Sequence, residues 1–164
     1  ISSAASDVYK RQHRGHGEGH TQMKIRDAAI TDASALYRLN CVSMGYDHPE
    51  EKTAAQLEKL LDSGRDKLLV AEIDGQVVGY LHLVDYELLY AGPLKNVMGI
   101  AVDPEHRRMG IGKALLEAGE KWARESGAEG IRLVSGESRV GAHAFYRALG
   151  YEGSKMQLNL KKMF

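Results

Sequence analysis

The sequence has 164 residues, 43% hydrophobic and 27% charged, which is the length and composition of one globular domain and excludes a wholly disordered chain. Its 22 basic and 22 acidic side chains cancel, so the net charge favours neither nucleic acid nor an anionic membrane as a partner. No apolar run approaches the roughly twenty residues of a membrane-spanning helix, and the single cysteine excludes an internal disulfide and suits a reducing, cytoplasmic location.

The first segment, Ile1–Gln22, differs from the rest of the chain. It has no helical or strand periodicity and contains three glycines and three histidines. We expect a disordered extension, or a translation or cloning leftover. Its residues 16–20 could hold a metal ion weakly, but a flexible tail is the better interpretation. The folded domain is expected to span residues 23–164.

The first half of that domain shows two helical stripes and a hairpin. Thr31 or Asp32 can cap the first helix, and Pro49 suits the first turn of the second. Asp74-Gly75 separates two strand-like runs and is the strongest local signal, because this pair tolerates positive φ and closes a tight antiparallel hairpin. The expected elements are a strand at 24–28, helices at 33–44 and 49–63, and strands at 68–73 and 76–84.

The second half is expected to alternate strands and helices. Residues 86–93 are expected to be irregular. The elements that follow are a strand at 96–102, an amphipathic helix at Gly110–Ser126, a strand at 131–134, a helix at 142–149 and a final strand at Lys155–Leu160. Antiparallel strands followed by strand–helix–strand crossovers predict an α/β fold with a mixed sheet and helices on its faces.

The most informative segment is the turn between the strand at 96–102 and the helix that follows it. The turn is basic and contains two glycines, Gly110 and Gly112. Unpaired N–H groups at the helix start, helped by the helix dipole, would form a cradle for a phosphate group. The alternative is a glycine-assisted turn with solvated basic side chains, because short glycine motifs give many false positives.

Two nucleotide-binding motifs nearly fit this turn and fail. A P-loop requires glycine where Arg107 stands and Ser or Thr where Ala114 stands. A dinucleotide fingerprint requires a small residue where Leu115 stands. No acidic residue is placed to hold magnesium, so we expect an anion bound without a metal.

With its context, the turn resembles the GNAT superfamily of acetyl-CoA-dependent N-acetyltransferases. Arg107-x-x-Gly110-x-Gly112 matches the family's R/Q-x-x-G-x-G/A motif, and Ala142–Tyr151 is similar to its helix with a central tyrosine and a following glycine. The resemblance covers 23–164. It implies a single-domain fold with a mixed, mostly antiparallel sheet, a central parallel splay and helices on both faces.

The resemblance also implies how acetyl-CoA is bound. The residues implied in binding are Ile100, Ala101 and Val102 beside the pantetheine arm, Arg107, Arg108, Met109, Gly110, Ile111, Gly112 and Lys113 around the pyrophosphate, and Ser138, Arg139 and Tyr146. One departure concerns Arg139, which stands where many members carry an asparagine that touches the pantetheine. Ser138 could substitute for it, or Arg139 could reach a phosphate.

Amide formation requires a neutral amine, whose ammonium form has a pKa near ~10, so a base or an ordered water must remove a proton. The amine would then attack the thioester directly, through a tetrahedral intermediate. Tyr146 is the implied proton donor to the departing thiolate, although its place on an apolar stripe also fits a core tyrosine. Glu137 or a water is the expected base. Asp85, Glu87, His48 and Glu50 are alternatives that also fit solvated surface charge.

The acceptor is expected to be a small cationic amine. The residues expected to bind it are Tyr46, His48, Asp85, Tyr86 and Glu87, which offer aromatic faces and carboxylates. Acetylation of a protein N-terminus or lysine, a non-catalytic acyl-CoA sensor and a nucleotide-phosphate binder are alternatives. The predicted final strand would leave a sheet edge through which a homodimer could form.

Overall fold

A computed structural model describes residues 22–164 of the chain. The predicted N-terminal extension therefore lies, apart from Gln22, outside the described residues. The chain divides into two compact units, one ending at Leu133 and the other running from Val134 to Phe164. No helix in the described range is long and apolar enough to cross a membrane.

The first unit contains a sheet, three α-helices and two short 3₁₀ helices, and the second contains one α-helix. In chain order the elements are β1 (Met23–Asp27), η1 (Ile30–Asp32), α2 (Ala33–Met44), α3 (Glu50–Asp62), β2 (Asp66–Ile73), β3 (Gln76–Leu88), β4 (Ala91–Val102), η2 (Pro104–His106), α4 (Ile111–Glu125), β5 (Gly130–Arg132) and α5 (Val140–Ala148).

The five strands form one sheet in the order β1-β2-β3-β4-β5. The first four pair antiparallel, and β4 pairs parallel with β5 over Leu94–Asn96 and residues 130–132. The predicted α/β fold with a mixed, mostly antiparallel sheet is therefore confirmed. So is the first hairpin, because Ile73 pairs with Gln76 across a turn whose two residues both have positive φ.

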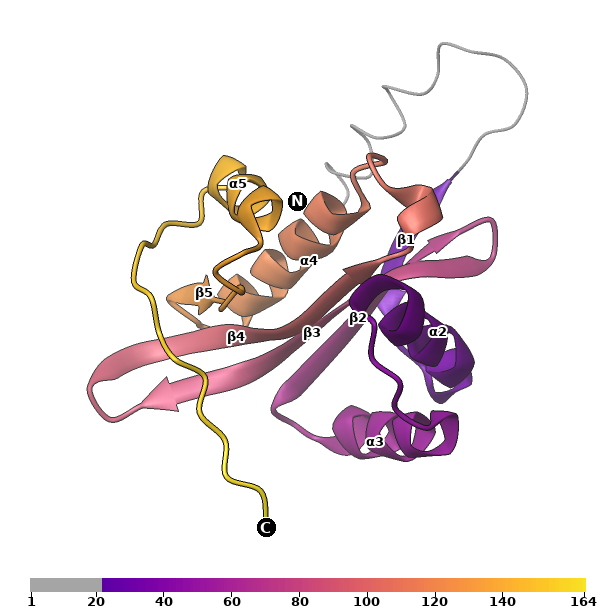
Figure 1. The fold of residues 1–164 in the computed structure, drawn as a ribbon, viewed down its shortest axis with the longest axis horizontal. Coiled ribbons are helices and arrows are strands. Elements are labelled where there is room, and N and C mark those ends of the chain that lie inside the picture. The colour runs from indigo at the N-terminus through magenta and orange to yellow at the C-terminus, as the bar shows by residue number, and fades with distance from the viewer. Residues whose placement is uncertain (1–21) are drawn as a thin grey trace. The chain divides into compact units, whose positions relative to one another are not determined.

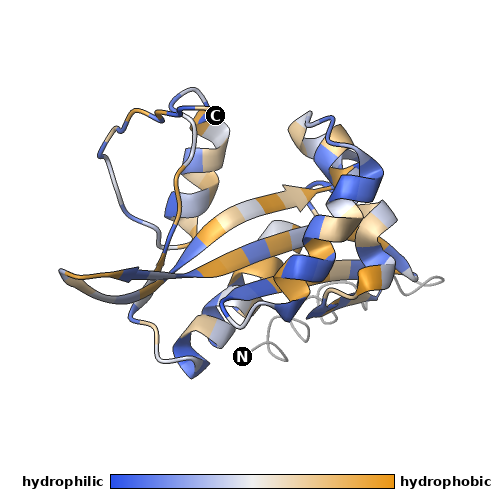
Figure 2. Cartoon of the chain, turned by 90° about the horizontal axis from the view of Figure 1, so that it is seen from below, coloured by the Kyte–Doolittle hydropathy of each residue, from blue (hydrophilic) through white to orange (hydrophobic). Residues whose placement is uncertain are grey.

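Helices cover both faces of this sheet, as predicted (Figure 1). On one face, α2 and α3 bury Leu36, Leu39 and Leu57 against strand residues that include Val70 and Tyr80. On the other face, α4 lies so close that a Cβ added at Gly119 would come within 2.8 Å of leucine side chains of β3. Figure 2 shows the helices banded with hydrophobic and hydrophilic residues, as expected for helices with one buried face.

Two sequence predictions about strands are wrong. Lys155–Leu160 forms no strand, and Met156, Leu158 and Leu160 are 64–87% exposed. A strand needs a partner for its backbone groups, which an alternating pattern cannot supply by itself. Without this strand the parallel pair lies at the edge of the sheet. Residues 86–93 are not irregular either, since Leu88 pairs with Ala91 and closes a second hairpin.

Candidate acyl-CoA and amine site

One edge of β4 is open within the first unit. The ladder to β5 ends at Asn96, whereas β4 continues to Val102. On the other side, the Asp103 N–H donates to the Val78 carbonyl opposite it, at 2.8 Å. Because hydrogen-bonded and non-hydrogen-bonded pairs alternate along an antiparallel ladder, the N–H groups of Ile100 and Val102 point away from β3. The end of β4 can therefore pair with an extended ligand.

The Val102 carbonyl supports this assignment. It accepts a hydrogen bond from the Ser43 hydroxyl of α2 at 3.1 Å instead of one from β3. Helix α2 thus approaches the end of β4 on the side opposite β3. Ala101, which lies between the two residues whose N–H groups point away from β3, is buried.

The turn after β4 exposes backbone N–H groups at the start of α4. Arg108 and Gly110 have φ of +64° and +75°, and Gly110 is the N-cap of α4. Glycine tolerates this left-handed conformation without the penalty that a side chain brings. Ala114 donates to the Gly110 carbonyl at 3.0 Å, so the N–H groups of residues 111–113 precede the first intrahelical bond.

The charges around this turn suit an anion. Arg107, Arg108 and Lys113 are exposed, while Ile111 is 1% exposed and anchors the helix start in the core. Two acidic side chains precede this turn: Asp103 is buried and already paired with Arg38, whereas Glu105 is exposed beside the three cations. Positive charge, free N–H groups and the helix dipole therefore converge here, which fits the pyrophosphate of acetyl-CoA.

Asp103 is ionised at this position. Its burial favours the neutral acid, but the Arg38 hydrogen bond, the Glu105 N–H and the Arg38 charge outweigh burial and hold the pKa of Asp103 below its usual range.

A pocket of about 460 Å³ opens beside α2 and the loop that follows it. Its lining residues are Asn40, Met44, Tyr46, Asp47, His48 and Tyr80. The Tyr80 hydroxyl donates to Asn40 Oδ1 at 2.6 Å. A Cβ built on Gly99 of β4 would lie 3.4 Å from the same hydroxyl. The pocket therefore borders β4 one residue before Ile100.

Tyr80 is a neutral hydrogen-bonding group in this pocket. Burial, and next the charge of Tyr46, raise the pKa of Tyr80 to about 12. Its oxygen can still accept a hydrogen bond after donating to Asn40, and the Asp47 carboxylate adds negative charge to the lining. A cationic amine matches this combination of phenol, amide and carboxylate.

The structure brings together only part of the predicted acceptor set. Tyr46 and His48 line the pocket, whereas Asp85, Tyr86 and Glu87 do not. Asp85 pairs with Lys95, the Tyr86 ring lies under the guanidinium of Arg132 at 4.4 Å, and Glu87 is exposed. Sequence reasoning did not select Asn40, Met44 or Tyr80. Asn40 is a polar residue on the otherwise apolar stripe of α2, and this feature of the sequence could have indicated a role in a site.

The second unit holds the predicted tyrosine on α5. Tyr146 is 8% exposed and contacts the rings of Phe145 and Tyr151, with centroids 5.3 and 5.9 Å away. Burial raises the pKa of Tyr146, although the nearby Arg139 charge opposes this. Its hydroxyl is therefore protonated at neutral pH.

The turn before α5 holds the other predicted residues of this unit. Glu137, Ser138 and Arg139 are exposed, and Arg139 is the N-cap of α5. The turn is tied to the helix by a hydrogen bond of 2.9 Å between His143 Nε2 and the Gly136 carbonyl.

Comparison with known proteins identifies the family. Residues 33–151 match the acetyltransferase (GNAT) family. An N-alpha-acetyltransferase of Sulfurisphaera tokodaii is 29% identical over 82% of this chain and 83% of its own length. Aminoglycoside N(6')-acetyltransferase type 1 of Stenotrophomonas maltophilia is 31% identical over 78% and 85%.

A solved structure shows the same fold. The aminoglycoside N-acetyltransferase AAC(6')-Iy in complex with CoA superposes with a TM-score of 0.80, over 90% of this chain and 99% of that one, at 20% identity. At this identity the likeness shows the fold alone. The family match and the curated relatives establish that the chain belongs to the GNAT acetyltransferase family and is an acetyl-CoA-dependent N-acetyltransferase.

Proposed function

We propose that this enzyme acetylates a small cationic amine. The observation that carries the proposal is the pocket of phenol, amide and carboxylate groups that borders β4 beside its open edge. Relatives named for aminoglycoside acetylation support an amine of this kind.

The acyl donor would be held by two sets of backbone groups. The N–H groups of Ile100 and Val102 would pair with the pantetheine arm, and those of 107–113 would bind the pyrophosphate, with Arg107, Arg108 and Lys113 adding charge. Ser138 or Arg139 stays a proposed contact to the same ligand, as the family resemblance implies. Acetyl-CoA supplies an activated acyl group as a thioester, and no metal is needed for this chemistry.

The protein's own groups would control two protons. The pocket would orient the amine, and Glu137 or an ordered water would remove its proton, since the ammonium form has no lone pair for attack. A backbone N–H near Val102 would stabilise the negative charge that develops on the carbonyl oxygen. Tyr146, a neutral phenol, would protonate the leaving sulfur.

Calorimetry with CoA tests the first step. We expect wild type to bind CoA and Gly112→Glu to lose binding, because a carboxylate would stand where the pyrophosphate is expected. Gly64→Glu is the matched control: a Cβ at Gly64 meets nothing within 4 Å, and the site lies before β2. Equal binding by all three proteins would contradict the assignment of the turn.

The acceptor is tested by thiol release from acetyl-CoA with a panel of free amines and peptides. We expect turnover with small diamines and amino sugars, and loss of turnover in Asp47→Asn. Turnover with peptides alone would favour a protein N-terminus or lysine instead. Binding of CoA without turnover on any amine would favour the acyl-CoA sensor.

A further inference from the structure

Helix α2 holds the junction between β4 and the turn that follows. Arg38 donates through one guanidinium nitrogen to Asp103 Oδ2 at 2.8 Å and through the other to the Val77 carbonyl at 3.2 Å. Ser43, further along the same helix, donates to the Val102 carbonyl. Two of these contacts, to Asp103 and Val102, tie α2 to the point where the open strand edge becomes the basic turn, and the third ties it to the start of β3.

Asp103 is the centre of this junction. Its side chain is 5% exposed and its second oxygen accepts the Glu105 N–H at 3.0 Å, which caps η2. Its backbone N–H and carbonyl are bonded to Val78 and to the His106 N–H. The His106 ring lies 3.8 Å from the carboxylate, too far for a hydrogen bond, and has a smaller electrostatic effect on it than Arg38, so Arg38 is the main cation that compensates this buried charge.

We propose that Arg38 is a positioning residue for the acyl-CoA site. Through Asp103 it sets the direction of the chain between the Val102 N–H and the N–H groups at the start of α4. This inference rests on the proposed function, because it takes both sets of N–H groups to bind one CoA molecule. Hydrogen bonds weaken steeply as their angle departs from linearity, so misplaced donors lose affinity for the ligand.

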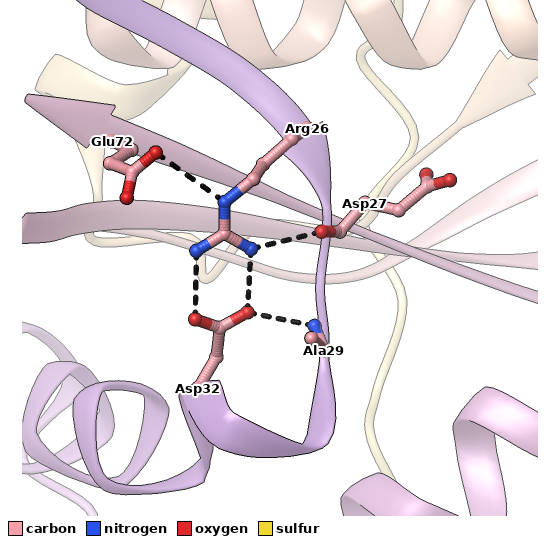
Figure 3. A network of polar contacts seen from close by, with 5 residues as sticks. All are labelled: Arg26, Asp27, Ala29, Asp32 and Glu72. Carbon is pink, nitrogen blue, oxygen red and sulfur yellow. Dashed lines mark hydrogen bonds and ion pairs between the residues drawn. The ribbon is translucent and has the colours of Figure 1, made fainter. Parts of the chain in front are cut away.

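The molecule offers a matched control for the chemistry of this pair. Arg26 binds both oxygens of Asp32 at 2.7 and 2.9 Å, and Asp32, with a side chain 7% exposed, also accepts the Ala29 N–H (Figure 3). The control therefore has the same residue types, similar burial and a similar link to a 3₁₀ helix. It lies at β1, three strands away from β4.

The experiment compares CoA binding by the full chain in wild type, Arg38→Gln and Arg26→Gln, with urea unfolding of each. We expect both variants to be destabilised, because each leaves a buried carboxylate without its cation. Only Arg38→Gln should raise the Kd for CoA, by about tenfold or more, which is the effect of losing about one hydrogen bond to a charged group. The KM for the amine should change less than the KM for acetyl-CoA, and Arg38→Lys should restore much of the CoA affinity.

Other results would overturn the inference. If wild type binds CoA and Arg38→Gln binds it equally well, Arg38 has no positioning role. An equal loss of affinity in Arg26→Gln would show a general effect of stability. If Arg38→Gln does not fold, Asp103→Asn carries the same test, because it keeps an acceptor for the Glu105 N–H but loses the charge that Arg38 compensates. Absence of CoA binding by wild type would overturn the proposed function itself.

Discussion

At the scale of single residues, the two buried tyrosines differ in what surrounds their hydroxyls. Tyr80 donates to Asn40 and borders the pocket in the first unit. Tyr146 is surrounded by Phe145 and Tyr151 on its own unit, and burial keeps it protonated. A protonated phenol in an apolar setting suits a proton donor, whereas a phenol already bonded to an amide suits a fixed part of a binding site.

The proposed proton-donor role of Tyr146 predicts a specific loss. Tyr146→Phe should lower kcat by about 10- to 1000-fold, the usual effect of removing a general acid, because the ring and its packing are kept while the proton is lost. The Kd for CoA, measured by calorimetry, should change little. An unchanged kcat in Tyr146→Phe would remove this residue from the mechanism.

At the scale of elements, α4 begins at the basic turn and covers one face of the sheet. Its buried residues include Ile111, Leu115 and Leu116. Gly119 lets the helix approach β3, since a Cβ there would lie 2.7 and 2.8 Å from the methyl groups of Leu81 and Leu83. The position of the turn therefore depends on close packing between α4 and β3.

The space around two helical glycines predicts opposite effects of replacing them with alanine. Gly119→Ala should destabilise the protein by about 1–3 kcal/mol, because both leucines are fully buried and must shift. Gly141→Ala in α5 should stabilise it by up to about 1 kcal/mol, because a Cβ there meets nothing within 4 Å and alanine favours the helix. Urea denaturation measures both, and equal effects would contradict the close packing of α4.

At the scale of the whole molecule, two arginine–aspartate pairs fix the chain at the ends of β1 and β4. Hydrogen bonding to Arg26 holds the pKa of Asp32 below its usual range despite burial, and Arg38 does the same for Asp103. Glu72 also faces Arg26, and His106 also faces Asp103. The first pair joins the consecutive elements β1 and η1 across six residues, whereas the second joins α2 to the end of β4 across 65 residues and so stabilises the tertiary fold.

These pKa shifts predict acid sensitivity. A carboxyl group with a lowered pKa in the folded state contributes stability above its unfolded pKa of about 3.9, and this contribution is lost as the pH falls toward the folded value. The free energy of unfolding should therefore decrease below about pH 4. Arg26→Gln should be less stable than wild type at pH 7, and the difference should shrink in acid. A constant difference from pH 7 to pH 3 would contradict the role of this pair.

Much of the fold could be predicted because its signals are local. The Asp74-Gly75 hairpin, the amphipathic stripe of α4 and the glycines of the basic turn each depend on residues within a few positions of one another. The predicted strand at 155–160 had an equally regular pattern and was wrong, since strand formation depends on a partner elsewhere in the chain.

The sequence by itself determined most of the element types, the basic turn and the family resemblance. The tertiary structure alone decided which strand edge is open, which of the predicted acceptor residues line one pocket, and that Arg38 compensates Asp103. Those features arise from contacts between distant positions: Arg38 and Asp103 are 65 residues apart, and Asn40 and Tyr80 are 40 apart. No local periodicity encodes such contacts, because they exist only after the sheet and α2 have packed together.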